Sequence, residues 1–223
     1  MQDPGYVRSA FARIARRYVL ANHVLSMGID VLWRRKVARL VRGFAPQRVL
    51  DLATGSGDLA EAVRNACPQA LVVGGDFCLP MLAEARRRGL PHLVAADGMN
   101  LPFGDAAFDA LTIGFGLRNM ASWPGAVREM ARVLRPGGHL VVLDFSLPAG
   151  VLRGPYRFYL HHVLPRLAGW LTGQRGAYEY LGGTIEQFPS GPAMVALLTE
   201  NGFSNAESRP LTGGIASLYV ATR

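Results

Sequence analysis

The stretch V-L-D-L-A-T-G-S-G-D, residues 49–58, decides the fold. Its first half is an apolar run typical of a buried strand, and its second half is a glycine-rich turn that leads into a segment with helical spacing. Gly55 and Gly57 permit backbone angles that side chains forbid, so the turn can pass close to a ligand. The first N–H groups of the following helix have no partner within that helix. We therefore expect a strand, a turn and a helix that together bind a nucleotide-containing cofactor.

Asp51 sets this turn apart from a phosphate-binding loop. A carboxylate aimed into the turn repels a pyrophosphate and attracts an ammonium group. The better ligand is therefore a cationic one such as S-adenosylmethionine, which carries an amino group and a sulfonium. Gly55, Gly57 and Ala60 also fit the dinucleotide pattern G-x-G-x-x-A, so the turn alone leaves a nicotinamide cofactor open.

Beyond residue 48 the chain alternates short apolar runs with segments of helical spacing, which predicts β-α-β units and a parallel sheet. Right-handed crossovers place the carboxyl ends of the strands at one edge, where ligands of such sheets bind. Proline and adjacent glycines at 135–138 should separate the third helix from the fifth strand. Strands are expected at 48–53, 70–75, 93–95, 110–114 and 139–145, with helices at 59–66, 80–88 and 123–134.

The 223 residues fit one α/β domain. A helix at 193–201 and strands at 206–210 and 216–221 should close the sheet with an antiparallel pair. We divide the domain into four parts: an N-terminal helical cap at 5–42, a cofactor-binding core at 48–148, a helical substrate-side insertion at 151–192, and a C-terminal helix with edge strands at 193–223.

Two further acids follow the second and third expected strands. Asp76 lies 19 residues after the last glycine of the turn (76 − 57), the spacing at which an acid binds both ribose hydroxyls of an adenosine. Asp97 can accept a hydrogen bond from the adenine amine, while Gly98 leaves its N–H free for a ring nitrogen. Phe77 or Met99 then covers the adenine faces, unless either is simply part of the core.

The formal net charge of +8 and the isoelectric point of 10.2 invite nucleic-acid and anionic-membrane partners. Aromatic residues are not interleaved with the arginines as a single-strand binder requires, so no nucleic acid is expected. The arginine run at 86–88 is interpreted as a solvated helix end. A basic cluster near the N-terminus is typical of helices that lie on anionic lipid; it comprises Arg13, Arg16, Arg17, Arg34, Arg35, Lys36 and Arg39.

Lys36 is the only lysine. A short-chain dehydrogenase needs a Tyr-x-x-x-Lys pair, so neither that chemistry nor a Schiff base is expected. Cys67 and Cys78 have neither metal-ligand spacing nor a disulfide framework, and are interpreted as packing residues in a reduced, cytoplasmic setting. We expect no secretory signal, and no apolar run approaches the about 20 residues of a membrane span.

Longer segments resemble the C-methyltransferases of ubiquinone and menaquinone biosynthesis over nearly the whole chain. F-G-L-R-N, with the Tyr-x-Tyr-Leu and Phe-Pro elements, is fairly specific to this family, whereas the cofactor turn is generic to class I methyltransferases. The chain departs from the family pattern at Val19 after Tyr18, at Asp144 in place of glutamate, and at Gly98 in place of alanine. The segments are V-L-D-L-A-T-G-S-G-D-L-A, L-T-I-G-F-G-L-R-N-M, V-L-R-P-G-G-H-L-V-V-L-D-F-S and A-Y-E-Y-L-G-G-T-I-E-Q-F-P.

The resemblance implies a Rossmann-like class I methyltransferase fold with a seven-stranded, mostly parallel sheet and helices on both faces. It also implies methyl transfer from S-adenosylmethionine to a ring carbon of a polyprenylated demethylquinol, with demethylmenaquinol as the leading acceptor. That carbon becomes nucleophilic when the adjacent phenol ionises, so a cationic or hydrogen-bonding group near the phenolate promotes the reaction. The candidates for this group or for binding the ring are Arg118, which would hold a water that accepts the proton, Asn119, Tyr178, Tyr18 and His162. The expected cofactor-binding residues are Asp51, Thr54, Gly55, Ser56, Gly57, Asp76, Phe77, Asp97, Gly98 and Gly114.

Several alternatives stay open at this stage. The benzoquinol of the ubiquinone pathway and other phenols are alternative acceptors, and His162 is equally well explained as a packing or capping residue. A noncatalytic module that binds an adenosine ligand is an alternative of a different class, and charge alone suggests RNA methylation. The expected partners are the quinol and a transient anionic membrane surface. We expect a cytoplasmic enzyme at the inner membrane face, and the resemblance leads us to expect a homodimer.

Overall fold

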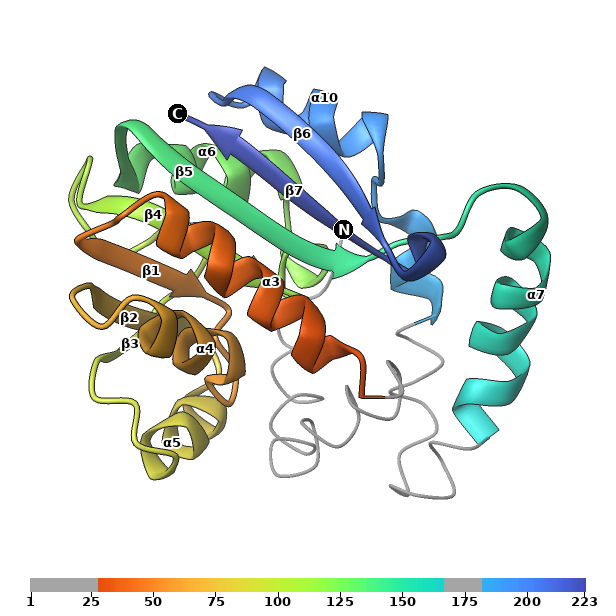
Figure 1. Cartoon of the computed structure of the whole chain (residues 1–223), viewed down its shortest axis with the longest axis horizontal. Coiled ribbons are helices and arrows are strands. Elements are labelled where there is room, and N and C mark those ends of the chain that lie inside the picture. Colours follow the sequence, from red (N-terminus) through yellow and green to blue (C-terminus); the bar gives the residue numbers. More distant parts are fainter. Residues whose placement is uncertain (1–27, 167–181) are drawn as a thin grey trace.

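The computed structural model describes residues 28–166 and 182–223, which form a seven-stranded sheet in the order β3-β2-β1-β4-β5-β7-β6 (Figure 1). Neighbouring strands among β1 to β5 are parallel, and β7 runs antiparallel to both β5 and β6. The predicted mostly parallel sheet with an antiparallel last strand is confirmed. The strands are β1 (Arg48–Leu52), β2 (Leu71–Asp76), β3 (Leu93–Ala95), β4 (Phe108–Gly114), β5 (Leu134–Phe145), β6 (Ser204–Leu211) and β7 (Ala216–Thr222).

The central strands are buried on both faces, as their continuous apolar runs predict. Successive side chains enter two separate cores: Val49 and Val141 lie in one, and Leu50 and Val142 lie in the other. Each core is completed by the apolar face of the helices that cover it.

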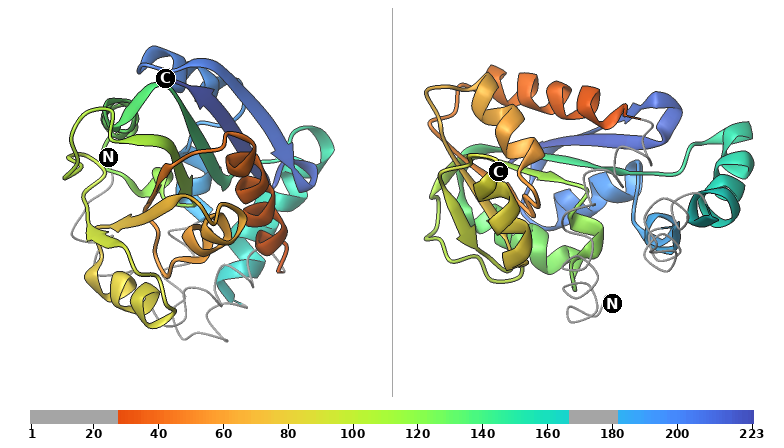
Figure 2. Two further views of the ribbon diagram at one scale, coloured as in Figure 1. Left: turned by 60° about the vertical axis from the view of Figure 1, so that its left-hand side comes forward. Right: turned by 90° about the horizontal axis from the view of Figure 1, so that it is seen from below.

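The first core is covered by α3 (Asp30–Gly43), α4 (Asp58–Ala66) and α5 (Leu79–Arg87), and the second by α6 (Trp123–Val133) and α10 (Pro192–Glu200). Figure 2 shows the red α3 on one side of the sheet and the green α6 and blue α10 on the other. The predicted helices on both faces are therefore confirmed. α6 begins where Ser122 Oγ accepts a hydrogen bond from Gly125 N at 3.2 Å, with a proline in its first turn.

The fifth strand begins earlier than the sequence predicts. The expected strand starts at residue 139 after a turn, but β5 starts at Leu134 and contains that turn as a bulge. Phe108 pairs with Leu134 and Ala110 with His139, so residues 135–138 of β5 lie opposite the single residue Asp109 of β4. The bulge depends on glycine, because Gly137 has φ 76° and a Cβ on Gly138 would lie 2.8 Å from the carbonyl oxygen of Arg135.

The described part of the insertion predicted at 151–192 is mostly helical, with residues 188–191 as the exception. η2 (Gly150–Leu152), α7 (Arg153–Phe158) and the π-helical η3 (Tyr159–Val163) follow β5, and residues 182–187 are also helical. In Figure 1, α7 stands beyond the end of β5, away from the sheet. Of the predicted N-terminal cap, the structure describes α3, while Tyr18 lies outside the described residues. The division of the chain into four parts stays a prediction.

Two short 3-10 helices complete the described elements, η1 (Leu117–Asn119) after β4 and η4 (Thr212–Gly214) before β7. Across residues 28–166 and 182–223, none of the helices has both the length and the apolar character needed to cross a membrane.

Candidate functional site

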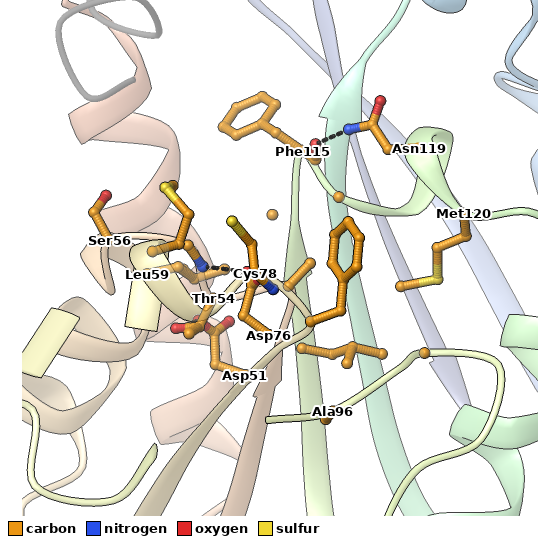
Figure 3. A pocket seen from close by; sticks show the side chains of 18 of the residues that line it. Asp51, Thr54, Ser56, Leu59, Asp76, Cys78, Ala96, Phe115, Asn119 and Met120 are labelled. Atoms are coloured by element: carbon orange, nitrogen blue, oxygen red, sulfur yellow. Dashed lines mark hydrogen bonds between the residues drawn. The ribbon is translucent and has the colours of Figure 1, made fainter. Parts of the chain in front are cut away.

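A cavity lies at the carboxyl ends of β1, β2 and β4 and beside the loop after β3, around the point where the strand order reverses between β1 and β4 (Figure 3). Open α/β sheets bind their ligands at this point. Nine of the ten residues predicted to bind a cofactor line the cavity: Asp51, Thr54, Gly55, Ser56, Asp76, Phe77, Asp97, Gly98 and Gly114.

Asp51 is the most deeply buried acid among the described residues that line the cavity, with 1% of its surface exposed. Its Oδ2 accepts a hydrogen bond from Thr54 Oγ1 at 2.7 Å, and its Oδ1 accepts one from Thr112 Oγ1 at 2.6 Å. Burial raises the pKa of Asp51 from 3.8 to about 6, although the two hydroxyls and the Arg34 charge lower it in part. A cation bound beside Asp51 would favour its ionised form, so the site suits an ammonium group.

The turn between β1 and α4 has a left-handed backbone at three positions. The φ angles are 52° at Ala53, 57° at Gly55 and 87° at Gly57. A Cβ on Gly57 would lie 2.0 Å from Leu90 Cδ1, whereas one on Gly55 would lie 3.1 Å from Met81 Cε. Gly57, the tenth predicted residue, therefore permits packing behind the turn, and Gly55 lies in the wall of the cavity. Glycine adopts such angles without strain, so Ala53 is the strained residue of this turn, and a strained residue beside a cavity is typical of functional sites.

Arg88 ties the start of α4 to the end of α5. Its Nη1 donates to Asp58 Oδ1 at 2.7 Å and to the Ser56 carbonyl at 3.1 Å, and its Nη2 donates to Glu61 Oε2 at 3.1 Å. Arg88 is exposed at the end of α5, as the interpretation of this arginine run predicts, and it also pairs with Asp58 and Glu61 of α4. Burial acts to raise the pKa of Asp58, but Arg34, Ser56 and Arg88 together hold it below its ordinary value.

Asp76 joins the turn after β1 to the turn after β2. Its Oδ2 accepts from Gly55 N and its Oδ1 accepts from Cys78 N, both at 2.8 Å. Burial raises the pKa of Asp76, while these backbone donors lower it in part. Each oxygen has a second lone pair for a further donor, so the carboxylate can also bind the hydroxyls of a ribose.

The loop after β3 supplies Asp97 and Gly98. Asp97 is exposed, and its Oδ1 accepts from Met99 N at 2.9 Å. A Cβ on Gly98 would lie 2.6 Å from Met120 Cε. The glycine that replaces the alanine of the family pattern therefore makes room for Met120, which itself lines the cavity (Figure 3).

Of the candidates for binding the acceptor, Asn119 reaches the cavity and Arg118 does not. Asn119 lines the cavity from η1, with Nδ2 donating to the Phe115 carbonyl at 3.4 Å. Arg118 is buried at 2% exposure, pairs with Asp144, and lies 5.4 Å from the centre of the Phe145 ring. Burial raises the pKa of Asp144, although Arg118 lowers it in part. Arg118 is therefore not among the described residues that line the cavity, and its predicted role toward the acceptor stays a prediction.

The remaining candidates lie elsewhere. His162 stacks on Phe158 with ring centroids 4.7 Å apart, on the exposed part of η3, and does not line the cavity. Tyr18 and Tyr178 lie outside the described residues, so their roles stay predictions. Cys67 and Cys78 are buried free thiols, in agreement with their interpretation as packing residues, and Cys78 also lines the cavity.

Several lining residues were missed by reasoning from the sequence alone. Arg34 enters from α3, Met81 from α5, and Phe115 and Met120 flank η1. Phe115 and Met120 both fall within the segment L-T-I-G-F-G-L-R-N-M, so proximity to Asn119 was an available signal. For Arg34 the only signal was its charge, which it shares with its neighbours.

The lining residues fit an adenosine ligand that carries a positive charge. Acids from β1, from β2 and from the loop after β3 surround one cavity, and they suit an ammonium, a ribose and an adenine amine in turn. A dinucleotide would instead bring its pyrophosphate to the turn beside Asp51 and Asp58, where like charges repel. The cavity therefore favours the cationic donor over the nicotinamide cofactor.

Comparison with known proteins gives a consistent result. The model of the ubiE/COQ5 methyltransferase family matches residues 2–223. A demethylmenaquinone methyltransferase of Thermus thermophilus is 48% identical over 96% of this chain and 99% of its own length. A ubiquinone/menaquinone biosynthesis C-methyltransferase of Bdellovibrio bacteriovorus is 40% identical over 99% of this chain and 97% of its own. Among solved structures, an S-adenosylmethionine-dependent methyltransferase of Thermotoga maritima superposes with a TM-score of 0.67 at 17% identity, over 96% of this chain and 98% of the other.

Proposed function

The chain belongs to the ubiE/COQ5 methyltransferase family, and on that premise we propose that it transfers a methyl group from S-adenosylmethionine to a ring carbon of demethylmenaquinol. The observation that carries the proposal is the 48% identity to a demethylmenaquinone methyltransferase over almost the full length of both chains. The cavity supports it, because its acids suit a cationic adenosine donor and its wall includes apolar side chains.

The methyl donor is S-adenosylmethionine, which supplies a methyl group activated by a sulfonium. We assign the ammonium of its amino-acid part to Asp51 and the ribose hydroxyls to Asp76. Asp97 and the backbone of Gly98 are assigned to the adenine edge. Gly55 is assigned to the close approach of the turn to the ligand, because it lines the cavity with a φ of 57° and carries no side chain.

The acceptor reacts at a ring carbon next to a phenolate, and Asn119 is the described side chain best placed to favour that ion. It lies at the cavity on a short helix that follows β4, and its amide nitrogen is a hydrogen-bond donor. A donor near the phenolate lowers the cost of ionising the phenol, and the ionised ring pushes electron density onto the ortho carbon.

Arg118 has a different proposed role from Asn119. The buried ion pair of Arg118 with Asp144 joins η1 to the end of β5, so it fixes the segment that carries Asn119. We therefore treat Arg118 as a positioning residue. Any water held by its guanidinium, as the sequence suggested, stays a prediction.

The experiment is the location of the transferred methyl group by NMR after reaction with reduced demethylmenaquinol. A methyl on the ring carbon supports the proposal, and a methyl on oxygen refutes it. Asn119→Ala should lower kcat and leave the Kd for S-adenosylhomocysteine unchanged. Asn65→Ala is the matched control, because Asn65 is exposed on α4 and does not line the cavity.

The benzoquinol of the ubiquinone pathway is the second candidate acceptor. The observation that favours it is the relative in Bdellovibrio bacteriovorus, whose name covers both the ubiquinone and the menaquinone pathways. Both acceptors require the same chemistry at a ring carbon beside a phenolate. Discrimination between the naphthoquinol and the benzoquinol therefore depends on the shape and size of the ring.

We also propose that the protein binds transiently to an anionic membrane on the cytoplasmic side, where a polyprenylated quinol resides. Support comes from what we call the α7 surface: Val151, Leu152 and Phe158, exposed at 91%, 54% and 60% respectively, with the exposed Arg153 and Arg157 beside them. Apolar side chains flanked by cations suit an anionic lipid interface. Figure 1 shows α7 projecting away from the sheet.

Vesicle flotation tests this contact. The protein should float with vesicles that contain phosphatidylglycerol more than with neutral phosphatidylcholine vesicles, and Phe158→Ser should weaken flotation. Leu79→Ser is the matched control, because Leu79 is 64% exposed on the distant α5. Equal flotation with both kinds of vesicle, or equal effects of the two substitutions, would refute the proposed contact. A homodimer is proposed from the family resemblance alone, and sedimentation velocity tests it.

A further inference from the structure

The cavity contains a cation that the assigned roles do not use. Among the described residues that line it, Arg34 is the only lysine, arginine or histidine. It comes from α3, which precedes the cofactor turn in the chain and packs against α4. The Arg34 side chain is buried, with 7% of the residue exposed, and arginines are rarely buried unless they are paired. Its place beside a ligand cavity therefore calls for a partner or a role that a solvated surface charge does not require.

The position of Arg34 is fixed from two directions. Its Nη1 donates to Asp30 Oδ2 at 2.6 Å, and Asp30 is fully buried. Its Cζ lies 5.9 Å from the centre of the Phe115 ring, which itself lines the cavity. The guanidinium carries five N–H donors in a planar fork, so one bond to Asp30 leaves donors for a second carboxylate.

Arg34 also acts electrostatically on the acidic end of the cavity. Its charge lowers the pKa of Asp58 and, against the larger effect of burial, that of Asp51. Arg34 and Asp51 therefore lie close enough to interact, and they line the same cavity.

This arrangement matches the two charges of an amino acid. An α-amino acid carries its ammonium and its carboxylate on one carbon, so the groups that bind them must also be neighbours. Asp51 is suited to the ammonium. A carboxylate beside Asp51 would be repelled by Asp51 and Asp58 unless a cation met it, and Arg34 is the cation present.

We propose that Arg34 binds the α-carboxylate of the methionine part of S-adenosylmethionine, so that Asp51 and Arg34 together recognise the zwitterion. This inference rests on the proposed function for the identity of the donor. Arg34 on this account is a specificity residue: it distinguishes the complete donor from adenosine thioethers that lack a carboxylate.

The test compares two ligands by isothermal titration calorimetry: S-adenosylhomocysteine and its decarboxylated analogue, which keeps the ammonium. The unmodified protein should bind the first about 10- to 100-fold more tightly, the range expected for a charge-assisted hydrogen bond. Arg34→Gln should remove most of this preference, because it should weaken the binding of S-adenosylhomocysteine and leave the affinity for the decarboxylated analogue unchanged. Arg35→Gln is the matched control, because it removes the same charge from an exposed neighbour on α3 that does not line the cavity.

The outcomes separate this inference from the proposed function. Equal affinity of the unmodified protein for the two ligands overturns the inference even if no variant folds. If Arg34→Gln lowers the affinity for both ligands equally, the inference is also overturned, because an equal loss of affinity indicates a structural role for Arg34. The double variant Asp30→Asn with Arg34→Gln removes the buried pair as a unit and should show the same lost preference. Failure to bind either ligand would refute the proposed donor itself, and the inference with it.

Discussion

Replacing Asp51 with asparagine should stabilise the ligand-free protein at neutral pH while weakening its binding of the methyl donor. The carboxyl has a pKa of about 6 in the folded chain against 3.8 in the unfolded chain. Ionised Asp51 is therefore a cost of folding. The difference of about 2.2 pH units corresponds to about 3 kcal/mol at about 1.4 kcal/mol per unit. Asparagine keeps the shape of the side chain and avoids this cost.

The sign follows from the raised pKa. The contribution of Asp51 to stability is fully present below pH 3.8, decreases as the pH rises, and is lost above about pH 6. The stability advantage of Asp51→Asn over the unmodified protein should therefore grow by about 1.4 kcal/mol between pH 5 and pH 8, or several degrees in Tm for a chain of this size. Comparing the two proteins at each pH cancels the titration of Asp76 and Asp144. Urea unfolding and thermal melts at both pH values measure this advantage.

Binding should change in the opposite direction. A cationic ligand requires ionised Asp51, so the affinity of the unmodified protein for S-adenosylhomocysteine should fall about tenfold from pH 8 to pH 5. In Asp51→Asn this part of the pH dependence should disappear, and the affinity at pH 8 should be at least about tenfold weaker. If the variant is less stable than the unmodified protein by the same amount at every pH, and the pH profile of binding is unchanged, then Asp51 neither has a raised pKa nor binds the ammonium.

Three other substitutions test the account. Asp76→Ala should weaken the binding of S-adenosylhomocysteine about 10- to 100-fold, because it removes the acceptor for the ribose hydroxyls. Calorimetry measures this affinity, and an unchanged value would contradict the assignment of Asp76. Gly57→Ala should cost at least about 1–3 kcal/mol in urea unfolding, because φ is 87° and the new methyl would meet Leu90; a neutral effect would show that the turn can rearrange. Arg118→Ala should cost about 3–5 kcal/mol by leaving Asp144 buried without this ion pair, whereas Arg118→Met with Asp144→Leu should cost less; equal losses would mean that the pair has no special role.

Much of the site could be predicted because its residues follow strands directly. A carboxylate in or after a parallel strand is carried to one edge of the sheet by the topology alone. Asp51, Asp76 and Asp97 therefore meet at one cavity, although they are far apart in the chain. The glycines between β1 and α4 could be predicted equally well, since the positive φ angles at Gly55 and Gly57 favour that residue type.

The rest depends on tertiary packing that no local pattern records. Arg34 belongs to a row of basic residues on one helix, and only the placement of α3 against α4 makes it different from Arg35. Arg118 was correctly expected near the carboxyl end of β4, but the direction of its side chain depends on Asp144 from β5. The sequence predicted a turn at residues 135–138, where the structure has a strand bulge. Proline and glycines occur in both, so the local pattern does not distinguish them.

Methyl transfer to the ring carbon of a demethylated naphthoquinol can be measured directly. The most direct measurement supplies labelled S-adenosylmethionine with reduced demethylmenaquinol and, in parallel, with a demethylated benzoquinol, using Asp76→Ala as the control. Label should enter the naphthoquinol ring and should fall strongly in Asp76→Ala when the donor concentration is limiting. Absence of label from both quinols, in a protein that binds S-adenosylhomocysteine, would contradict the proposed methyl transfer.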